Sequence, residues 1–198
     1  LFNNLSQEWW DENGKFRVLH QIRPLRIQYI LDQLQDRNFK TLNILDVGCG
    51  GGLVSESLSK LGAKVTGVDF IKKNIEIAKN HAIKKNIKVD YLHANIEKMN
   101  LRKKYDVIIM FEILEHLDDW RNFLLNINKN LNKNGTIIIS TINRNLISKM
   151  FAIYFAENIL NWIPKGTHSY KKLIKPNEIY SFMKSNNFKF KNIKGLVF

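Results

Sequence analysis

Short apolar runs alternate with longer amphipathic stretches along the middle of the chain. Five runs have the length and apolar content of strands, at 42–47, 63–68, 88–93, 105–110 and 136–141. Between them, apolar residues recur with helical spacing over 53–61, 71–85 and 119–131. Apolar strands separated by helices are typical of a parallel sheet that is covered on both faces. The pattern therefore predicts a doubly wound, mainly parallel α/β sheet within one domain.

Two parts of the chain lie outside this predicted core. Residues 17–35 predict a helix that contains Pro24, and residues 1–14, which carry two adjacent tryptophans, are expected to act as a lid. We divide the single domain 1–198 into an N-terminal segment 1–40, a cofactor-binding core 41–142, an apolar insert 143–176 and a C-terminal part 177–198.

Both ends of the chain carry a prediction of their own. The chain starts with Leu1 rather than methionine, so we expect the true N-terminus to be missing. Its first ten residues show no signal peptide. Residues 188–198 are expected to begin a further strand. Because the chain ends there, the edge of the sheet beside this strand would stay unpaired, so we also expect the C-terminus to be truncated.

Composition adds a strong positive charge to this picture. Lys and Arg number 31 against 18 Asp and Glu, which gives a formal net charge of +13. Such a charge suits nucleic acid, an anionic membrane or an acidic substrate. Because the lysines are scattered among many asparagines and isoleucines, we interpret most of them as a solvated surface. The single cysteine, Cys49, excludes a disulfide framework and suits a reducing compartment, so we expect a cytoplasmic protein.

A glycine-rich turn closes the first predicted strand, where an open α/β sheet binds its ligand. It runs from Asp46 through Gly48 and Gly50 to Gly52 as DVGCGGG. A dinucleotide loop needs G-x-G-x-x-G, and Leu53 stands where its third glycine would fall, which disfavours a nicotinamide oxidoreductase. Asp69 ends the second strand, where a carboxylate can accept hydrogen bonds from both ribose hydroxyls.

This fragment resembles the first motif of the class I S-adenosylmethionine-dependent methyltransferases, whose sheet is Rossmann-like. Further fragments narrow the resemblance to the ubiquinone-biosynthesis O-methyltransferase family. They are WWD at 9–11, LH at 19–20, RPLR at 23–26, FEILEH at 111–116, STINR at 140–144, PKGTH at 164–168 and IKP at 174–176. The resemblance implies S-adenosyl-L-methionine as cofactor and polyprenylated phenols and catechols as substrates.

Carried over position by position, the resemblance predicts several cofactor contacts. Arg26, Gly48, Asp69 and Phe111 match contacts of the family, and Phe111 stands where the family has methionine. We add three positions to this set. Asp46 and Gly50 belong to the same loop, and Asn95 is assigned to adenine from general methyltransferase geometry.

Glu112, Glu115 and His116 are the candidate catalytic residues. If the turn after the fourth strand is helical, the three share one face and could bind a divalent cation. Two carboxylates suit Mg²⁺, whereas a histidine ligand favours Mn²⁺, Zn²⁺ or Fe²⁺, and the cation would lower the pKa of a catechol oxygen. Without metal, His116 would be a general base oriented by the glutamates, or Glu112 would only cap a helix. The resemblance favours the cation.

The stretch 146–163 is unusually apolar. It is too short and too interrupted by polar residues for a transmembrane helix, so we expect peripheral contact with the inner membrane, from which a prenylated substrate would be taken. Basic residues that could face anionic headgroups follow it: Lys165, Lys171, Lys172 and Lys175. A buried helix or a dimer interface is the alternative for this stretch.

Other partners and functions remain open at this point. A complex with other ubiquinone-biosynthesis enzymes is a possible partner, and no nucleic-acid partner is expected because no basic face interleaved with aromatic residues is evident. The alternatives are an RNA or other small-molecule methyltransferase on the same fold, and a cofactor-binding protein without catalysis.

Overall fold

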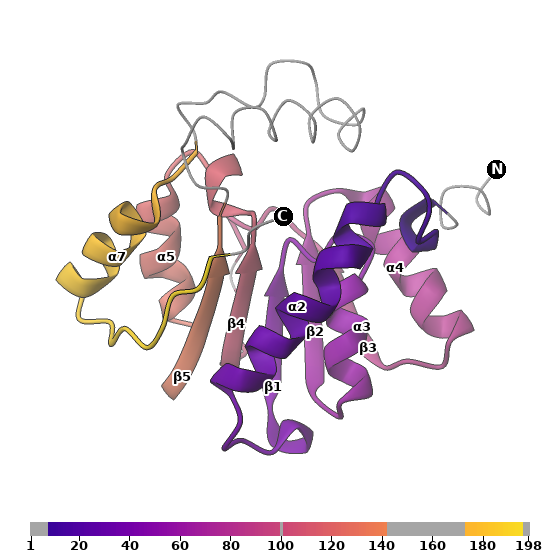
Figure 1. Cartoon of the computed structure of the whole chain (residues 1–198), viewed down its shortest axis with the longest axis horizontal. Coiled ribbons are helices and arrows are strands. Elements are labelled where there is room, and N and C mark those ends of the chain that lie inside the picture. Colours follow the sequence, from indigo (N-terminus) through magenta and orange to yellow (C-terminus); the bar gives the residue numbers. More distant parts are fainter. Residues whose placement is uncertain (1–7, 100, 142–172, 196–198) are drawn as a thin grey trace.

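The computed structural model describes residues 8–99, 101–141 and 173–195. Its described strands form one parallel sheet in the order β3-β2-β1-β4-β5 (Figure 1). The strands are β1 (Asn43–Val47), β2 (Lys64–Asp69), β3 (Val89–His93), β4 (Tyr105–Phe111) and β5 (Leu131–Ser140). The predicted doubly wound α/β fold is confirmed. Because β2 and β4 flank β1, the chain changes direction across the sheet between β1 and β4, at the place where such sheets bind ligands.

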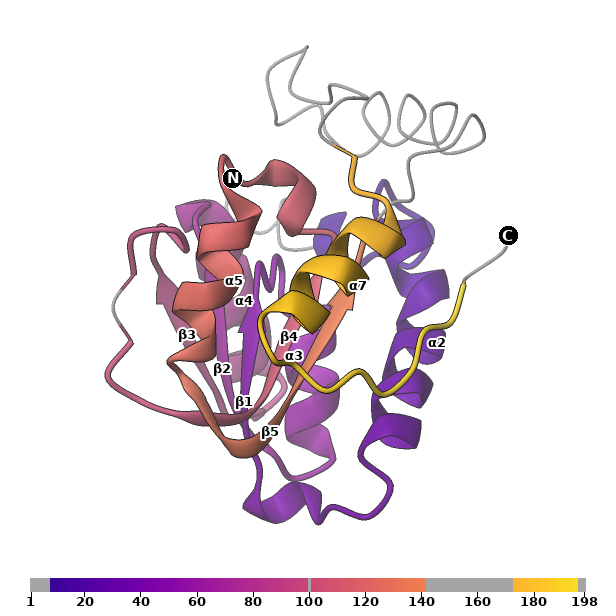
Figure 2. The ribbon, with the colours of Figure 1, turned by 90° about the vertical axis from the view of Figure 1, so that its left-hand side faces the viewer.

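Helices cover both faces of the sheet. One face packs against α2 (Arg17–Gln33), α3 (Leu53–Lys60) and α4 (Lys72–Lys84). The other face packs against α5 (Trp120–Asn128) and α7 (Pro176–Ser185), as Figure 2 shows from the side. With apolar helices on both sides, the central strands β1 and β4 are buried almost throughout, which explains their continuous apolar sequence.

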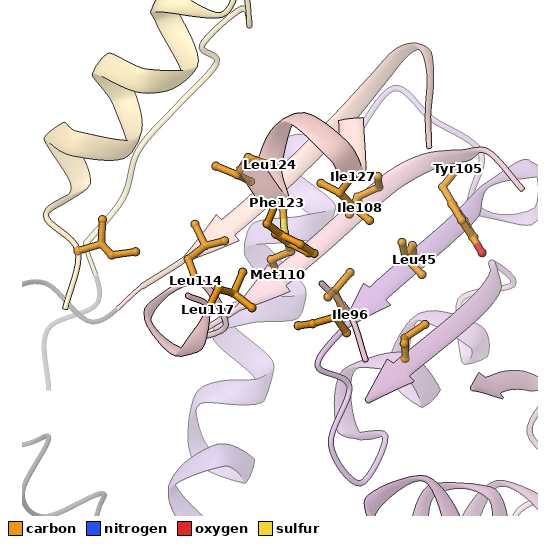
Figure 3. Packing of buried hydrophobic residues seen from close by; sticks show 13 residues of the cluster. Leu45, Ile96, Tyr105, Ile108, Met110, Leu114, Leu117, Phe123, Leu124 and Ile127 are labelled. Carbon is orange, nitrogen blue, oxygen red and sulfur yellow. The ribbon is translucent and has the colours of Figure 1, made fainter. Parts of the chain in front are cut away.

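The larger core lies under α5. Phe123 and Ile127 point from this helix toward Ile108 and Met110 of β4 (Figure 3). Burial of side chains of this size stabilises the fold by about 1.5–3 kcal/mol each. The carboxyl ends of β1 and β4 are thereby held in fixed register, and the residues that follow them form the candidate site.

The last strand departs from its predicted start. It begins at Leu131 and not at Thr136, and the pair Asn134-Gly135, which is typical of turns, lies within it. Leu131 pairs with Tyr105 and Thr136 with Val107, so extra residues bulge out of β5 between these pairs, with Asn134 in the left-handed region at φ 65°. The Asn-Gly pair therefore marks a bulge rather than a strand boundary.

The C-terminal part also differs from its prediction. Residues 188–195 form no strand: the described sheet ends at β5, and this stretch pairs with none of its strands and passes α2, where Lys194 pairs with Asp32. Helix α7, unpredicted, has signals in the sequence: Pro176 opens it, and Glu178 accepts a hydrogen bond from the Lys175 N–H.

Most of the predicted apolar insert 143–176 lies outside the described residues, and the division of the chain into parts stays a prediction. The described Leu173 and Ile174 are buried, and Ile174 joins the core under α5. Within the described ranges, no helix has the length and apolar character needed to cross a membrane.

Candidate active site

A cavity of about 1690 Å³ opens at the carboxyl ends of the strands. Its lining includes Asp69, Asn95, Glu112 and Ile193, and it continues along β5 from Leu131. Pockets for one small ligand usually measure about 300–1,000 Å³. The cavity is therefore large enough for a cofactor and a second molecule.

The glycine loop lines one side of this cavity through its backbone. Gly48 and Gly50 have φ angles of 71° and 54°, in the left-handed region. A Cβ atom on Gly48 would lie 1.9 Å from Ile113 Cδ1, and one on Gly50 would lie 2.5 Å from the Trp9 ring. Both glycines are needed for this path, because the side chains of Ile113 and Trp9 pack directly against them.

Asp46 lies beneath the loop rather than at its surface. It is buried and accepts a hydrogen bond from Ser55 Oγ. Burial raises its pKa to about 6, although the Ser55 hydrogen bond and the charge of Arg26 lower it in part. Asp46 lines the cavity but also fixes the start of α3 to the end of β1.

Asp69 is held at the end of β2 by the backbone around it. Its Oδ2 accepts from the Gly50 N–H at 2.9 Å, and its Oδ1 accepts from the Ile71 N–H at 2.8 Å. Burial raises its pKa, and these hydrogen bonds offset part of that rise. The acid and the loop thus form one unit. Asn95, also in the cavity lining, is exposed, and its Oδ1 accepts from the Glu97 N–H.

Arg26 and Glu112 meet in the middle of the cavity from distant parts of the sequence. The Arg26 guanidinium on α2 donates to Glu112 Oε2, and its Cζ lies 4.9 Å from the centroid of the Phe111 ring. Glu112 Oε1 accepts from Ser140 Oγ at the end of β5. With a φ of 51°, Glu112 leaves β4 in the left-handed region, where its carboxylate meets both donors.

The predicted metal triad is not assembled. Glu112 precedes the 3-10 turn Leu114–His116, so the helical face that would gather the three residues does not form. Glu115 is buried while His116 is exposed and lines the cavity. In the part of the chain described, no group of three acidic, histidine or cysteine side chains could hold a metal ion. The expectation of one shared helical face was wrong.

Four residues near the site were missed in the sequence. Phe70, 59% exposed, and Ser140 both line the cavity. Phe70 directly follows Asp69, and Ser140 opens the STINR fragment, so both had a signal in the sequence. Glu56 and His81 pair behind the loop, and no sequence pattern joins two residues 25 positions apart on different helices.

Comparisons with known proteins show which family this chain is similar to. The family model described as "Methyltransferase domain" matches residues 18–191. The "Ubiquinone biosynthesis O-methyltransferase" of Pelagibacter ubique is 45% identical over 100% of this chain and 85% of its own length. The protein of the same name from Rickettsia prowazekii is 43% identical over 100% of this chain and 79% of its own length.

Solved structures show the same fold at lower identity. Magnesium protoporphyrin IX methyltransferase from Synechocystis, with bound SAH, gives a TM-score of 0.68 at 21% identity and covers 90% of this chain and 77% of its own. The plantazolicin methyltransferase in complex with SAH gives 0.63 at 22% identity, over 92% and 73%.

Proposed function

This chain belongs to the ubiquinone biosynthesis O-methyltransferase family, and from that membership we propose that it methylates a hydroxyl of a polyprenylated phenol or catechol, using S-adenosylmethionine, in ubiquinone biosynthesis. The family resemblance drawn from the sequence fragments is confirmed. The observation that carries the proposal is identity above 40% with relatives of this name over the whole chain.

The cofactor side of the cavity has the groups that S-adenosylmethionine needs. When bound, the cofactor supplies a methyl group that its sulfonium already activates. The Gly48–Gly50 backbone would line its path, Asp69 would accept from ribose hydroxyls, and Asn95 would contact adenine. Arg26 and Phe111 would close this half of the site toward the acceptor.

The acceptor half must orient a hydroxyl and remove its proton. In this proposal the exposed His116 accepts the proton, because histidine is the side chain that most often does so near neutral pH. Glu112, held by Arg26 and Ser140, shapes the wall against which the ring rests. Glu115 is buried within the turn. Apolar residues of β5 and α7, such as Ile139 and Met183, would receive the prenyl chain.

No step in this proposal passes through a divalent cation, because Glu112, Glu115 and His116 do not gather around a common point. The prediction of a cation from the sequence can be tested directly with a chelator.

The test is transfer of labelled methyl to a short-chain prenylated catechol, by the wild type and the H116Q variant, with and without EDTA. We expect wild-type turnover in EDTA and a kcat about 100-fold lower in H116Q, with unchanged binding of S-adenosylhomocysteine. Failure to methylate the catechol while S-adenosylhomocysteine still binds would refute the proposed substrate. Loss of turnover in EDTA that Mg²⁺, Mn²⁺ or Zn²⁺ restores would refute the metal-free chemistry.

We further infer that the enzyme takes its substrate at an anionic membrane surface. A polyprenyl chain is nearly insoluble in water, and the apolar stretch 146–163 precedes four lysines. Replacing both Phe151 and Phe155 by serine should weaken binding to vesicles of anionic lipid severalfold and leave S-adenosylhomocysteine binding unchanged. Unchanged vesicle binding in the double variant would remove this proposal. The contact with other biosynthetic enzymes stays a prediction.

A further inference from the structure

The described N-terminal segment, residues 8–16, lies against the glycine loop. Trp9 lines the cavity, and its ring occupies the space that Cβ atoms on Gly50 and Gly51 would need. Its indole also stacks on Phe16, with ring centroids 4.1 Å apart and an interplanar angle of 12°. Trp9 therefore covers the part of the loop that faces the proposed cofactor.

The neighbouring Trp10 turns away from the loop and lies on α4. Its indole stacks on His81, with ring centroids 3.5 Å apart and an interplanar angle of 7°. Figure 1 shows the indigo start of the described chain beside this helix. Trp10 Nε1 is buried and finds no hydrogen-bond partner among the described residues, so ring contacts hold this indole: the stack on His81 and an edge contact with His20 at 6.3 Å between centroids.

His81 is held in place by Glu56, an acid on the neighbouring helix α3. Its Nδ1 lies 2.8 Å from Glu56 Oε1 and 3.0 Å from Oε2, and Glu56 is 1% exposed. Glu56 lies in the first turn of α3, where its N–H donates to Gly52 O of the glycine loop. The imidazole is thus a rigid platform attached to the same turn that binds the cofactor.

We propose that His81, held by Glu56, is a positioning residue for cofactor binding: it is the platform on which Trp10 stacks, and it thereby fixes Trp9 over Gly50 and Gly51. The inference rests on the proposed cofactor and not on the proposed acceptor. It gives residues 8–16 a defined attachment point on the core, through a contact between rings 71 positions apart in the sequence. If the Glu56–His81 pair served only to join α3 to α4, the Trp10 indole would not need to stack on His81.

The experiment measures binding of S-adenosylhomocysteine by calorimetry to the wild type and to H81A, H81F, W10A and the double variant W10A/H81A. H81F keeps a ring for stacking and removes the hydrogen bond to Glu56. I83A is the matched control, because Ile83 lies on the same helix and is 78% exposed. Trypsin cleavage after Lys15, inside the segment, gives a second measurement that needs no ligand.

We expect H81A and W10A each to raise the Kd about three- to tenfold and to speed cleavage after Lys15 by a similar factor, because each removes the same aromatic pair. The double variant should be no worse than either single variant, since the two rings act as a unit. H81F should stay within about twofold of the wild type, as should I83A.

The inference would be overturned if H81A had the same Kd for S-adenosylhomocysteine and the same rate of cleavage after Lys15 as the wild type. Equal losses in H81F and H81A would also overturn it, because the hydrogen bond to Glu56 and not the stack would then carry the effect. If H81A does not fold, W10A decides, since Trp10 is the other half of the stack. Absence of S-adenosylhomocysteine binding by the wild type would refute the proposed function, and cleavage after Lys15 would then decide this inference alone.

Discussion

The two halves of the cavity, which we propose for the cofactor and for the acceptor, are built in different ways. In the cofactor half, Asp69 is held by the N–H groups of Gly50 and Ile71, which lie 19 and 2 positions away. In the acceptor half, Glu112 is held by the side chains of Arg26 and Ser140, which lie 86 and 28 positions away. The first half rests on the backbone of one βαβ unit, whereas the second depends on side chains from three elements.

This difference determines what a substitution can disturb. A backbone-built site tolerates changes of side chain but fails where a Cβ atom is added to a left-handed glycine. A site built from paired side chains keeps its backbone but loses its geometry when one partner is removed. Substitutions in each half test this contrast.

The largest effect is expected in the cofactor half from Gly48→Ala. The left-handed φ and the clash with Ile113 should lower the free energy of unfolding by about 2–5 kcal/mol and abolish detectable S-adenosylhomocysteine binding. Urea unfolding and calorimetry would measure both. Gly195→Ala is the control, because its Cβ atom would meet nothing within 4 Å. Equal behaviour of the two variants would contradict a backbone-built site.

A smaller effect is expected from Asp46→Asn, and it depends on pH. Burial raises the pKa of Asp46 from 3.8 to about 6, so the folded protein binds the proton more tightly than the unfolded chain does. The stability from this group is fully present below pH 3.8 and is lost as the pH rises through about 6. The free energy of unfolding of D46N, relative to that of the wild type, should therefore rise by about 2–3 kcal/mol between pH 4 and pH 7.5, as measured by urea unfolding.

Asp106 should give a pH dependence of stability opposite to that of Asp46. Burial alone would raise its pKa, but hydrogen bonds from Asn43 and Asn132 and the charge of Arg37 outweigh burial and lower it. Its stabilising contribution is present at neutral pH and is lost on acidification, so D106N should lose stability relative to the wild type as the pH rises. The same slope in D46N and D106N would show that the burial of Asp46 is not the cause.

The smallest of the three effects is expected in the acceptor half. Removing Arg26 or Glu112 alone should lower the free energy of unfolding by about 1–2 kcal/mol, because the partner stays partly buried without its counter-charge. The R26A/E112A double variant should lose about 1 kcal/mol less than the sum of the single variants. K194A is the control, since the pair of Lys194 with Asp32 is exposed to solvent and should contribute little to stability. Additive losses would mean that Arg26 and Glu112 are not coupled.

The same contrast explains what the sequence could predict. The order of strands and helices and the parallel sheet followed from apolar spacing, and the glycine loop with Asp69 followed from residues close together in one unit. These features depend on local conformation, and the sequence records local conformation directly. The start of the last strand was predicted too late, because an Asn-Gly pair has the same left-handed preference in a turn before a strand and in a bulge within one.

The acceptor half could not be predicted to the same degree. Glu112, Glu115 and His116 have the spacing of one helical face, but the chain leaves β4 through a left-handed residue and only then turns. That conformation places Glu112 between Arg26 and Ser140, and it depends on tertiary contacts that the spacing of three residues does not contain. His81 contacts Trp10 and Glu56, which lie on other elements, so nothing close to it in the sequence indicates these contacts.

The pair Glu56–His81 has a further property that concerns where its proton lies. Burial raises the pKa of Glu56 from 4.5 to about 7, opposed in part by Lys60, Lys85 and Arg23. Burial, with Lys85, Lys60 and Lys84, lowers the pKa of His81 from 6.5 to about 4.

Both shifts favour the neutral form of the group, because burial disfavours the carboxylate of Glu56 and the imidazolium of His81 alike. As the pH rises, the raised pKa of Glu56 lowers the stability of the fold and the lowered pKa of His81 increases it, so the two pH dependences oppose each other. The contact between His81 and Trp10 should therefore change less with pH than the titration of either group alone would suggest.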